Sequence, residues 1–136
     1  MAAIKDLIQV NANNTLSFGN PELEEKTKIE DFLFEGDLYK VKTFKERTKL
    51  KKNGELLYES MPGTSVSDFV ETDDSVSCTI DTINDTQITL GLLENTEYQV
   101  FIDGASHGSV KTNLSGKLLV SLSHDSNKAI NLEVKK

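Results

Sequence analysis

The sequence contains few of the residues that most often carry out catalysis or bind metal ions. Its 136 residues include one cysteine, two histidines and no tryptophan. A single cysteine allows no internal disulfide, and the chain lacks the paired cysteine and histidine spacings of a zinc site. Alternation in the segment SVSCTID places Cys78 beside Val76 and Ile80 on one face of a strand. We therefore expect a buried, unreactive thiol.

No motif connects the two histidines to a catalytic nucleophile. His107 lies in the short loop that we expect at residues 105–108, and His124 precedes Asp125 and Ser126. Neighbours in sequence do not make a catalytic triad, because its three side chains converge from separate elements. Phosphate-binding and calcium-binding loop patterns are also missing. The sequence therefore predicts a protein that is not an enzyme and that uses no cofactor and no metal ion.

Long apolar runs are missing as well. The N-terminal segment MAAIKDLIQVNANN has no apolar core of a secretion signal, since Asp6 interrupts its hydrophobic residues. No stretch approaches the ~18 consecutive apolar residues that a membrane-spanning helix needs. We therefore expect a cytoplasmic protein with no transmembrane segment.

Apolar and polar residues alternate through most of the chain. The segments TQITLGL, YQVFIDG, KLLVSLS and AINLEVK each place their apolar side chains on one face, as half-buried strands do. Turn-forming residues separate these segments, and Asn53-Gly54 is the strongest hairpin signal among them. The pattern predicts an all-β fold, a single antiparallel β-sandwich of immunoglobulin-like or jelly-roll-like type, with about nine or ten strands over residues 14–136.

The N-terminal residues 1–13 are predicted to form an arm or a short helix. Ile4, Leu7 and Ile8 have helical spacing within residues 2–10, and Asn11 could end the helix. So short a helix is unstable alone in water, so it must dock on the sandwich or on a partner. The apolar patch of Ile4, Leu7 and Ile8 is accordingly a candidate interaction surface.

Two resemblances extend this interpretation. The C-terminal stretch YQVFIDGASHGSVKTNLSGKLLVSLS resembles the last strands of immunoglobulin-like accessory sandwiches in bacterial surface and carbohydrate-active proteins, through Asp103-Gly104, Thr112-Asn113 and Gly116. The stretch from TLSFGN through GDLYKVKTFKE to the C-terminus resembles a group of short bacterial proteins, some of which are labelled endosialidase. That label implies an acidic glycan as ligand. No catalytic residue of a sialidase can be matched to this chain, which has one arginine, Arg47.

Positive charge is concentrated in one segment. The chain has a net charge of -7, yet residues 40–52 hold seven of its fifteen lysines and arginines and a single acid, Glu46. That segment therefore carries a charge of +6, and the rest of the chain carries -13. Lys40 and Lys42 have even positions, whereas Lys45, Arg47, Lys49 and Lys51 have odd ones. A bulge or strand break near Thr43-Phe44 would bring both sets to one face of a hairpin.

Three uses of this basic hairpin remain open. It is a solvated edge that keeps sheets from pairing, a contact to the acidic surface of another copy, or a site for an acidic glycan or another polyanion. The negative net charge disfavours nucleic acid. We favour a non-catalytic module that acts through protein–protein contact, including homo-oligomeric or filamentous assembly, with polyanion binding as the alternative. The candidate surface combines the cations with two aromatic residues and the N-terminal patch: Lys40, Lys42, Lys45, Arg47, Lys49, Lys51, Tyr39, Tyr58, Ile4, Leu7 and Ile8.

Overall fold

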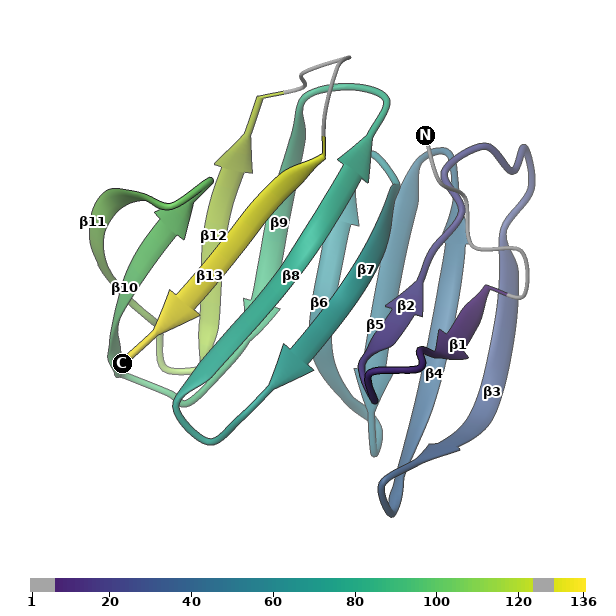
Figure 1. Cartoon of the computed structure of the whole chain (residues 1–136), viewed down its shortest axis with the longest axis horizontal. Helices are drawn as coiled ribbons and strands as arrows, with labels where there is room; N and C mark the ends of the chain where they lie inside the picture. The colour runs from purple at the N-terminus through teal and green to yellow at the C-terminus, as the bar shows by residue number, and fades with distance from the viewer. Residues whose placement is uncertain (1–6, 124–128) are drawn as a thin grey trace.

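The computed structural model describes residues 7–123 and 129–136 and shows two antiparallel β-sheets packed face to face (Figure 1). Sheet A has seven strands in the order β1-β2-β7-β8-β13-β10-β11, and sheet B has six in the order β12-β9-β6-β5-β4-β3. The strands of sheet A are β1 (Ile8–Val10), β2 (Leu16–Phe18), β7 (Thr64–Glu71), β8 (Ser75–Thr82), β13 (Ile130–Lys135), β10 (Glu97–Ile102) and β11 (Ala105–Lys111). The strands of sheet B are β12 (Lys117–Leu122), β9 (Thr86–Gly91), β6 (Glu55–Met61), β5 (Arg47–Lys52), β4 (Asp37–Phe44) and β3 (Thr27–Phe34).

The predicted all-β sandwich is confirmed, with more strands than expected. The described residues form 13 strands. Strands of three residues, such as β1, are too short to show an alternating pattern. Strand β11 is exposed on both faces over most of its length, so it has no apolar face to reveal it. His107 lies in this strand and not in a tight loop, because the hairpin turn is Asp103-Gly104, whose φ angles are 52° and 81°.

The predicted N-terminal helix is wrong over the part that the structure describes. Ile8–Val10 is strand β1, which pairs with β2, and Ile4 lies outside the described residues. Ile8 is 3% exposed and Leu7 is 9% exposed, and both belong to the hydrophobic core. As strand β1, this segment pairs with β2 and buries Leu7 and Ile8 between the sheets. That gain outweighs the weak helical preference indicated by the spacing of only three apolar residues.

The core lies between the sheets and is built from the inward side chains of both. At its centre the rings of Phe18, Tyr58 and Phe69 pack edge to face, with centroids 5.3 Å apart for Phe18–Tyr58 and 5.4 Å apart for Phe18–Phe69. Such T-shaped pairs suit the charge distribution of aromatic rings. Cys78 is buried in this core, and its burial raises the pKa of the thiol to about 12. A thiol in this environment stays protonated and unreactive.

A polar cluster lies beside the aromatic rings. The Thr64 hydroxyl lies 2.8 Å from the Tyr58 hydroxyl and 2.9 Å from the Ser60 hydroxyl. The Thr64 amide donates a 3.0 Å hydrogen bond to the Thr48 hydroxyl, which itself donates to the Thr64 carbonyl. Each of these four residues is fully buried. Their mutual hydrogen bonds offset the cost of removing the hydroxyls from water and connect sheet B to the start of β7.

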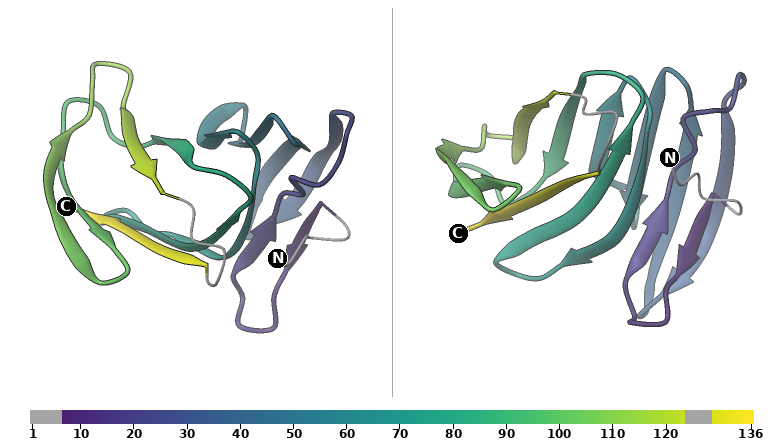
Figure 2. Two further views of the ribbon diagram at one scale, coloured as in Figure 1. Left: turned by 90° about the horizontal axis from the view of Figure 1, so that it is seen from above. Right: turned by 45° about the horizontal axis from the view of Figure 1, so that its top comes forward.

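The two sheets are continuous through one bent ribbon. Strand β9 pairs with β12 in sheet B, and β10 pairs with β11 in sheet A. The two linkers between these pairs are also hydrogen bonded, through Asn95 to the Asn113 carbonyl and through Leu92 to the Gly116 carbonyl. Seen from above, the ribbon curves from one layer into the other on the side opposite β1 and β3 (Figure 2). The outer face of sheet B near β3–β5 is thus far from this curved side.

Candidate functional site

Three consecutive hairpins form the part of sheet B that holds the basic segment. The turns are Glu35-Gly36 between β3 and β4, Lys45-Glu46 between β4 and β5, and Asn53-Gly54 between β5 and β6. The predicted Asn53-Gly54 hairpin is confirmed, with φ angles of 51° and 85°. Two-residue turns hold neighbouring strands in a fixed register, so the outward side chains of β3, β4 and β5 stand directly opposite one another.

The expected change of face occurs at a turn and not at a bulge. In β4, Val41 and Thr43 are buried, so Lys40 and Lys42 point outward. Phe44 lies opposite Arg47 across the turn, and opposed residues of an antiparallel pair share a face. Outward positions are therefore even-numbered in β4 and odd-numbered in β5. The prediction of a common face is confirmed for Lys40, Lys42, Arg47, Lys49 and Lys51, but not for Lys45, which lies in the turn. Of the two causes considered, the strand break is confirmed, since β4 ends at Phe44, and the bulge is wrong.

The outward cations form a cluster that we call the basic face, consisting of Lys28, Lys40, Lys42, Arg47, Lys49 and Lys51 on β3, β4 and β5. Lys42 stands between Lys28 on one neighbouring strand and Lys49 on the other, and Lys40 stands opposite Lys51. Like charges in directly opposed positions destabilise a sheet. The arrangement is therefore unfavourable for folding unless negative charge is supplied from elsewhere.

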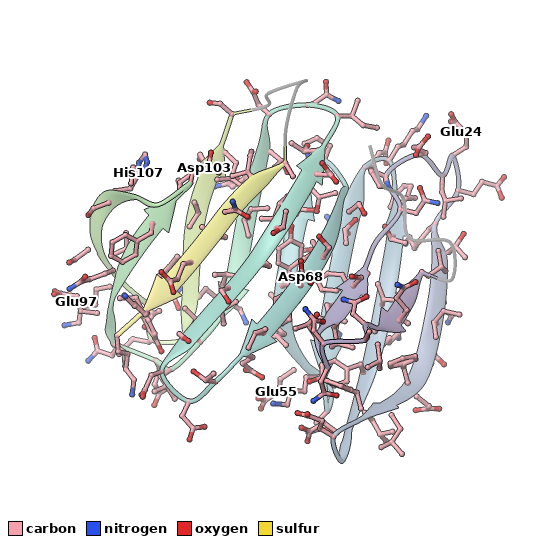
Figure 3. All side chains as sticks on the ribbon, viewed as in Figure 1. Glu24, Glu55, Asp68, Glu97, Asp103 and His107 are labelled. Carbon is pink, nitrogen blue, oxygen red and sulfur yellow. The ribbon has the colours of Figure 1, made fainter. Side chains whose placement is uncertain are left out.

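Part of that charge comes from acids of the chain. Glu30 lies 3.2 Å from Lys40 and 3.3 Å from Lys28, and Glu59 lies 3.4 Å from Arg47. Lys45 is in the turn and pairs at 2.8 Å with Glu24, which projects at the upper right of Figure 3. Lys45 thus belongs to the rim and not to the basic face.

The other cations of the basic face are Lys42, Lys49 and Lys51. They form no salt bridge among the described residues, although Lys49 stands opposite Glu59 on β6. The pKa of Lys42 is lowered, chiefly by the positive charge of Lys40 and then by partial desolvation and by further lysines, among them Lys28 and Lys49. Conversely, hydrogen bonds from Lys40 and Lys28 lower the pKa of Glu30. The centre of the face therefore keeps an excess of positive charge.

Five of the six cations of the basic face lie on interior strands, and only Lys28 lies on the edge strand β3. In sheet B, β4 and β5 are interior strands, and the edge strand on this side is β3. Edge lysines prevent sheets from pairing, but interior strands already have both neighbours. Strand β3 itself is interrupted by a bulge between Ile29 and Phe32, where Asp31 has a φ of 57°. The interpretation of residues 40–52 as an edge is therefore wrong, because the strands that hold them, β4 and β5, both have neighbours on either side.

A shallow hollow of about 250 Å³ lies at one end of the basic face. Its lining combines four cations, one acid and two apolar side chains: Lys26, Lys42, Arg47, Lys49, Glu46, Phe44 and Met61. Phe44 is half-buried and Met61 is exposed. The terminal Nη2 of Arg47 lies 3.5 Å from the Met61 sulfur. Sulfur is a weak acceptor, so this nitrogen remains available to a stronger one.

Four of the predicted surface residues lie in the core instead. Tyr39 is 6% exposed and Tyr58 is fully buried, because inward alternation in β4 and β6 turns both rings toward sheet A. Leu7 and Ile8 are core residues as described above. Desolvation raises the pKa of Tyr39. None of these side chains is available for stacking or docking on the outer face.

Lys26, Lys28 and Met61 were missed by the sequence reasoning. Lys26 precedes β3 and Lys28 lies within it, and their spacing of two is that of side chains on a common face of a strand. The sequence did not show that this strand lies beside β4 with Lys28 opposite Lys42. Met61 lies at the end of β6, and it reaches the hollow because β6 pairs with β5 on the side of β5 opposite to β4.

Other kinds of site find no support in the described residues. No group of three or more His, Cys, Asp or Glu side chains in residues 7–123 and 129–136 is arranged to hold a metal ion. Over the same ranges, the fold includes no helix that could span a membrane. Comparisons of the chain with protein-family models, curated proteins and solved structures give no match.

Proposed function

We propose that the protein binds an anionic ligand on the basic face of sheet B. The observation that supports this proposal is the row Lys28, Lys42 and Lys49, in which Lys42 is opposed by a lysine on both sides. An acidic chain gains nothing in folding stability from such a row. A bound anion would offset the repulsion among these lysines, so the row makes sense as a binding surface whose positive charge is neutralised by its ligand.

Heparin is a suitable first probe, because it presents many anionic groups to the face. We expect the wild-type protein to be retained on immobilised heparin at low salt and released as salt screens the charges. The variant Lys42→Gln/Lys49→Gln removes two cations that have no salt bridge in the described structure. It should bind about 5–30-fold more weakly, at a typical ~0.5–1 kcal/mol for each exposed ion pair.

The matched control is Lys111→Gln/Lys135→Gln, which changes the net charge equally but lies on β11 and β13 of the opposite sheet. Its retention on heparin should equal that of the wild type. Equal loss in both double variants would mean that net charge alone determines retention. That result would refute a site on the basic face.

Self-association is a second candidate, in which acids of another copy supply the negative charge. It is favoured by the outer face of sheet A, where Asp81 and Glu133 point outward and Asp68 is exposed on β7 (Figure 3). A contact between the outer faces of two different sheets would be heterologous and would extend into rings or filaments. Light scattering at several salt and protein concentrations tests it. A monomer throughout this range would exclude self-association and leave the binding of a separate anion.

A further inference from the structure

The hollow at the end of the basic face has a lining that a simple anion site does not need. Beside four cations it contains Glu46, in the turn between β4 and β5, and the apolar side chains Phe44 and Met61. At about 250 Å³ it is small for a ligand pocket, so it accommodates a compact ligand or one unit of a chain.

Glu46 bears on the chemistry of the ligand. A carboxylate repels phosphate and sulfate groups, which carry charge on every face. The same carboxylate accepts hydrogen bonds and binds a hydroxyl group well. Among cations that attract an anion, Glu46 therefore favours a ligand that presents a hydroxyl on one side and its negative charge on another.

The two apolar side chains favour the same kind of ligand. Phe44 is half-buried and Met61 is exposed, so a ligand with C–H groups would remove apolar surface from water when it covers them. An inorganic phosphate chain has no such groups. A sugar ring has a C–H face, which suits Phe44 and Met61, and a rim of hydroxyls, which suits Glu46.

Arg47 is placed to receive a planar carboxylate. Its Nε lies 3.4 Å from Glu59, and its Nη2 faces only the weakly accepting Met61 sulfur at 3.5 Å. A guanidinium binds a carboxylate through two parallel hydrogen bonds. A ligand carboxylate would thus replace a poor acceptor at Nη2 while Lys42 and Lys49 supply further positive charge.

We infer that the ligand of the basic face is a hydroxyl-bearing carboxylate of the uronic-acid class, with its carboxylate at Arg47, Lys42 and Lys49 and a hydroxyl at Glu46. This inference rests on the proposed anion binding at the same face and adds the chemical class of the anion. Uncharged sugars lack the group that the cations attract, and phosphates lack the hydroxyl and the C–H face.

Two soluble probes test the inference by calorimetric titration at low salt: trigalacturonate and inorganic tripolyphosphate. Charge alone predicts tighter binding of tripolyphosphate, which is the more highly charged of the two. We expect the opposite order for the wild-type protein. Tighter binding of tripolyphosphate would overturn the assignment of a hydroxyl-bearing carboxylate.

The variants Glu46→Gln and Glu46→Ala isolate the hydrogen bond at equal charge, because glutamine keeps an acceptor and alanine does not. Trigalacturonate should bind Glu46→Ala about threefold to tenfold more weakly than Glu46→Gln, as expected for one lost hydrogen bond. Tripolyphosphate should bind both variants equally and more tightly than it binds the wild type. Equal affinity of trigalacturonate for both variants would refute the role of Glu46.

The outcomes separate this inference from the proposed function. If tripolyphosphate binds more tightly and Lys42→Gln/Lys49→Gln abolishes its binding, the chemical class is wrong and anion binding stands. If neither probe binds the wild-type protein, both are wrong. Glu94→Gln, in the exposed linker between β9 and β10, is the matched control for loss of one acid and should leave both affinities unchanged.

Discussion

Thr64→Val tests the buried hydroxyl cluster that connects the two sheets. Valine has nearly the shape of threonine and leaves the backbone hydrogen bonds between Thr64 and Thr48 in place. It removes one hydroxyl, which lies 2.8 Å from that of Tyr58 and 2.9 Å from that of Ser60. Both partners are fully buried, so water cannot replace the lost contact without entering the core.

The cost follows from the two groups left without this partner. A buried polar group without a hydrogen bond costs about 1–3 kcal/mol, so two such groups would cost about 2–6 kcal/mol. The Tyr58 and Ser60 hydroxyls also interact with each other, so we expect the lower part of this range, about 2–4 kcal/mol. With a urea dependence of about 2 kcal/mol per M, the midpoint of unfolding should fall by about 1–2 M. Removing all three hydroxyls, in Tyr58→Phe/Ser60→Ala/Thr64→Val, should cost less than the three single substitutions combined, because no donor or acceptor then stays unpaired.

Urea unfolding followed by circular dichroism gives these values. The control is Thr89→Val, the same substitution on the outer face of β9, which should change stability by less than about 0.5 kcal/mol. A Thr64→Val variant as stable as this control would refute the reasoning. Strict additivity of the three single substitutions would do so too, since it would show that the hydroxyls do not depend on one another.

Three further predictions concern packing, charge and pH. Gly91→Ala should lower the free energy of unfolding in urea by at least about 2 kcal/mol, because a Cβ at this position would lie 1.8 Å from the Leu56 carbonyl oxygen. The control Gly36→Ala should cost less, since a Cβ there would meet no atom within 4 Å, and a larger loss for the control would contradict the close approach of β6 and β9. Lys42→Glu should raise the thermal unfolding temperature, because it turns the like-charge pairs with Lys28 and Lys49 into opposite-charge pairs. The increase should be smaller at high salt, and an increase that does not depend on salt would argue against charge repulsion as the cause. Burial raises the pKa of the Cys78 thiol from 9.0 in the unfolded chain to about 12 in the folded protein, so the neutral thiol contributes stability below pH 9 that is lost as the pH rises toward 12. The urea midpoint should therefore fall above pH 9, and it should fall less steeply with pH in Cys78→Ala. An equal dependence on pH in both proteins would show that the thiol is not responsible.

The sequence by itself determined the fold class and the faces of the longer strands. Alternation such as that of Leu118, Val120 and Leu122 places alternate side chains on opposite faces of any strand, whatever its neighbours are. The Asn53-Gly54 turn was readable for a similarly local reason, because few residue pairs adopt two positive φ angles. These features depend on residues close together in the chain.

The tertiary structure alone decided which strands are neighbours and that Leu7 and Ile8 are buried. Ile8 was predicted on the apolar face of a short helix that docks on the sandwich or on a partner, and its pairing with Phe18 in a strand buries it in the core instead. Tyr58 was predicted on a surface, but it is fully buried in the core, where its hydroxyl contacts that of Thr64 at the start of β7. Such contacts join segments from different parts of the chain, so the spacing of apolar residues within one segment cannot predict them.

The candidate site divides in the same way. The concentration of cations in residues 40–52 is a property of the sequence, and so is their return to a common face of a hairpin. The opposition of Lys42 to both Lys28 and Lys49, the interior position of β4 and β5, and the hollow with Glu46 depend on the strand order of sheet B. Strand order is set by the burial of both sheets against each other, which only the folded chain achieves.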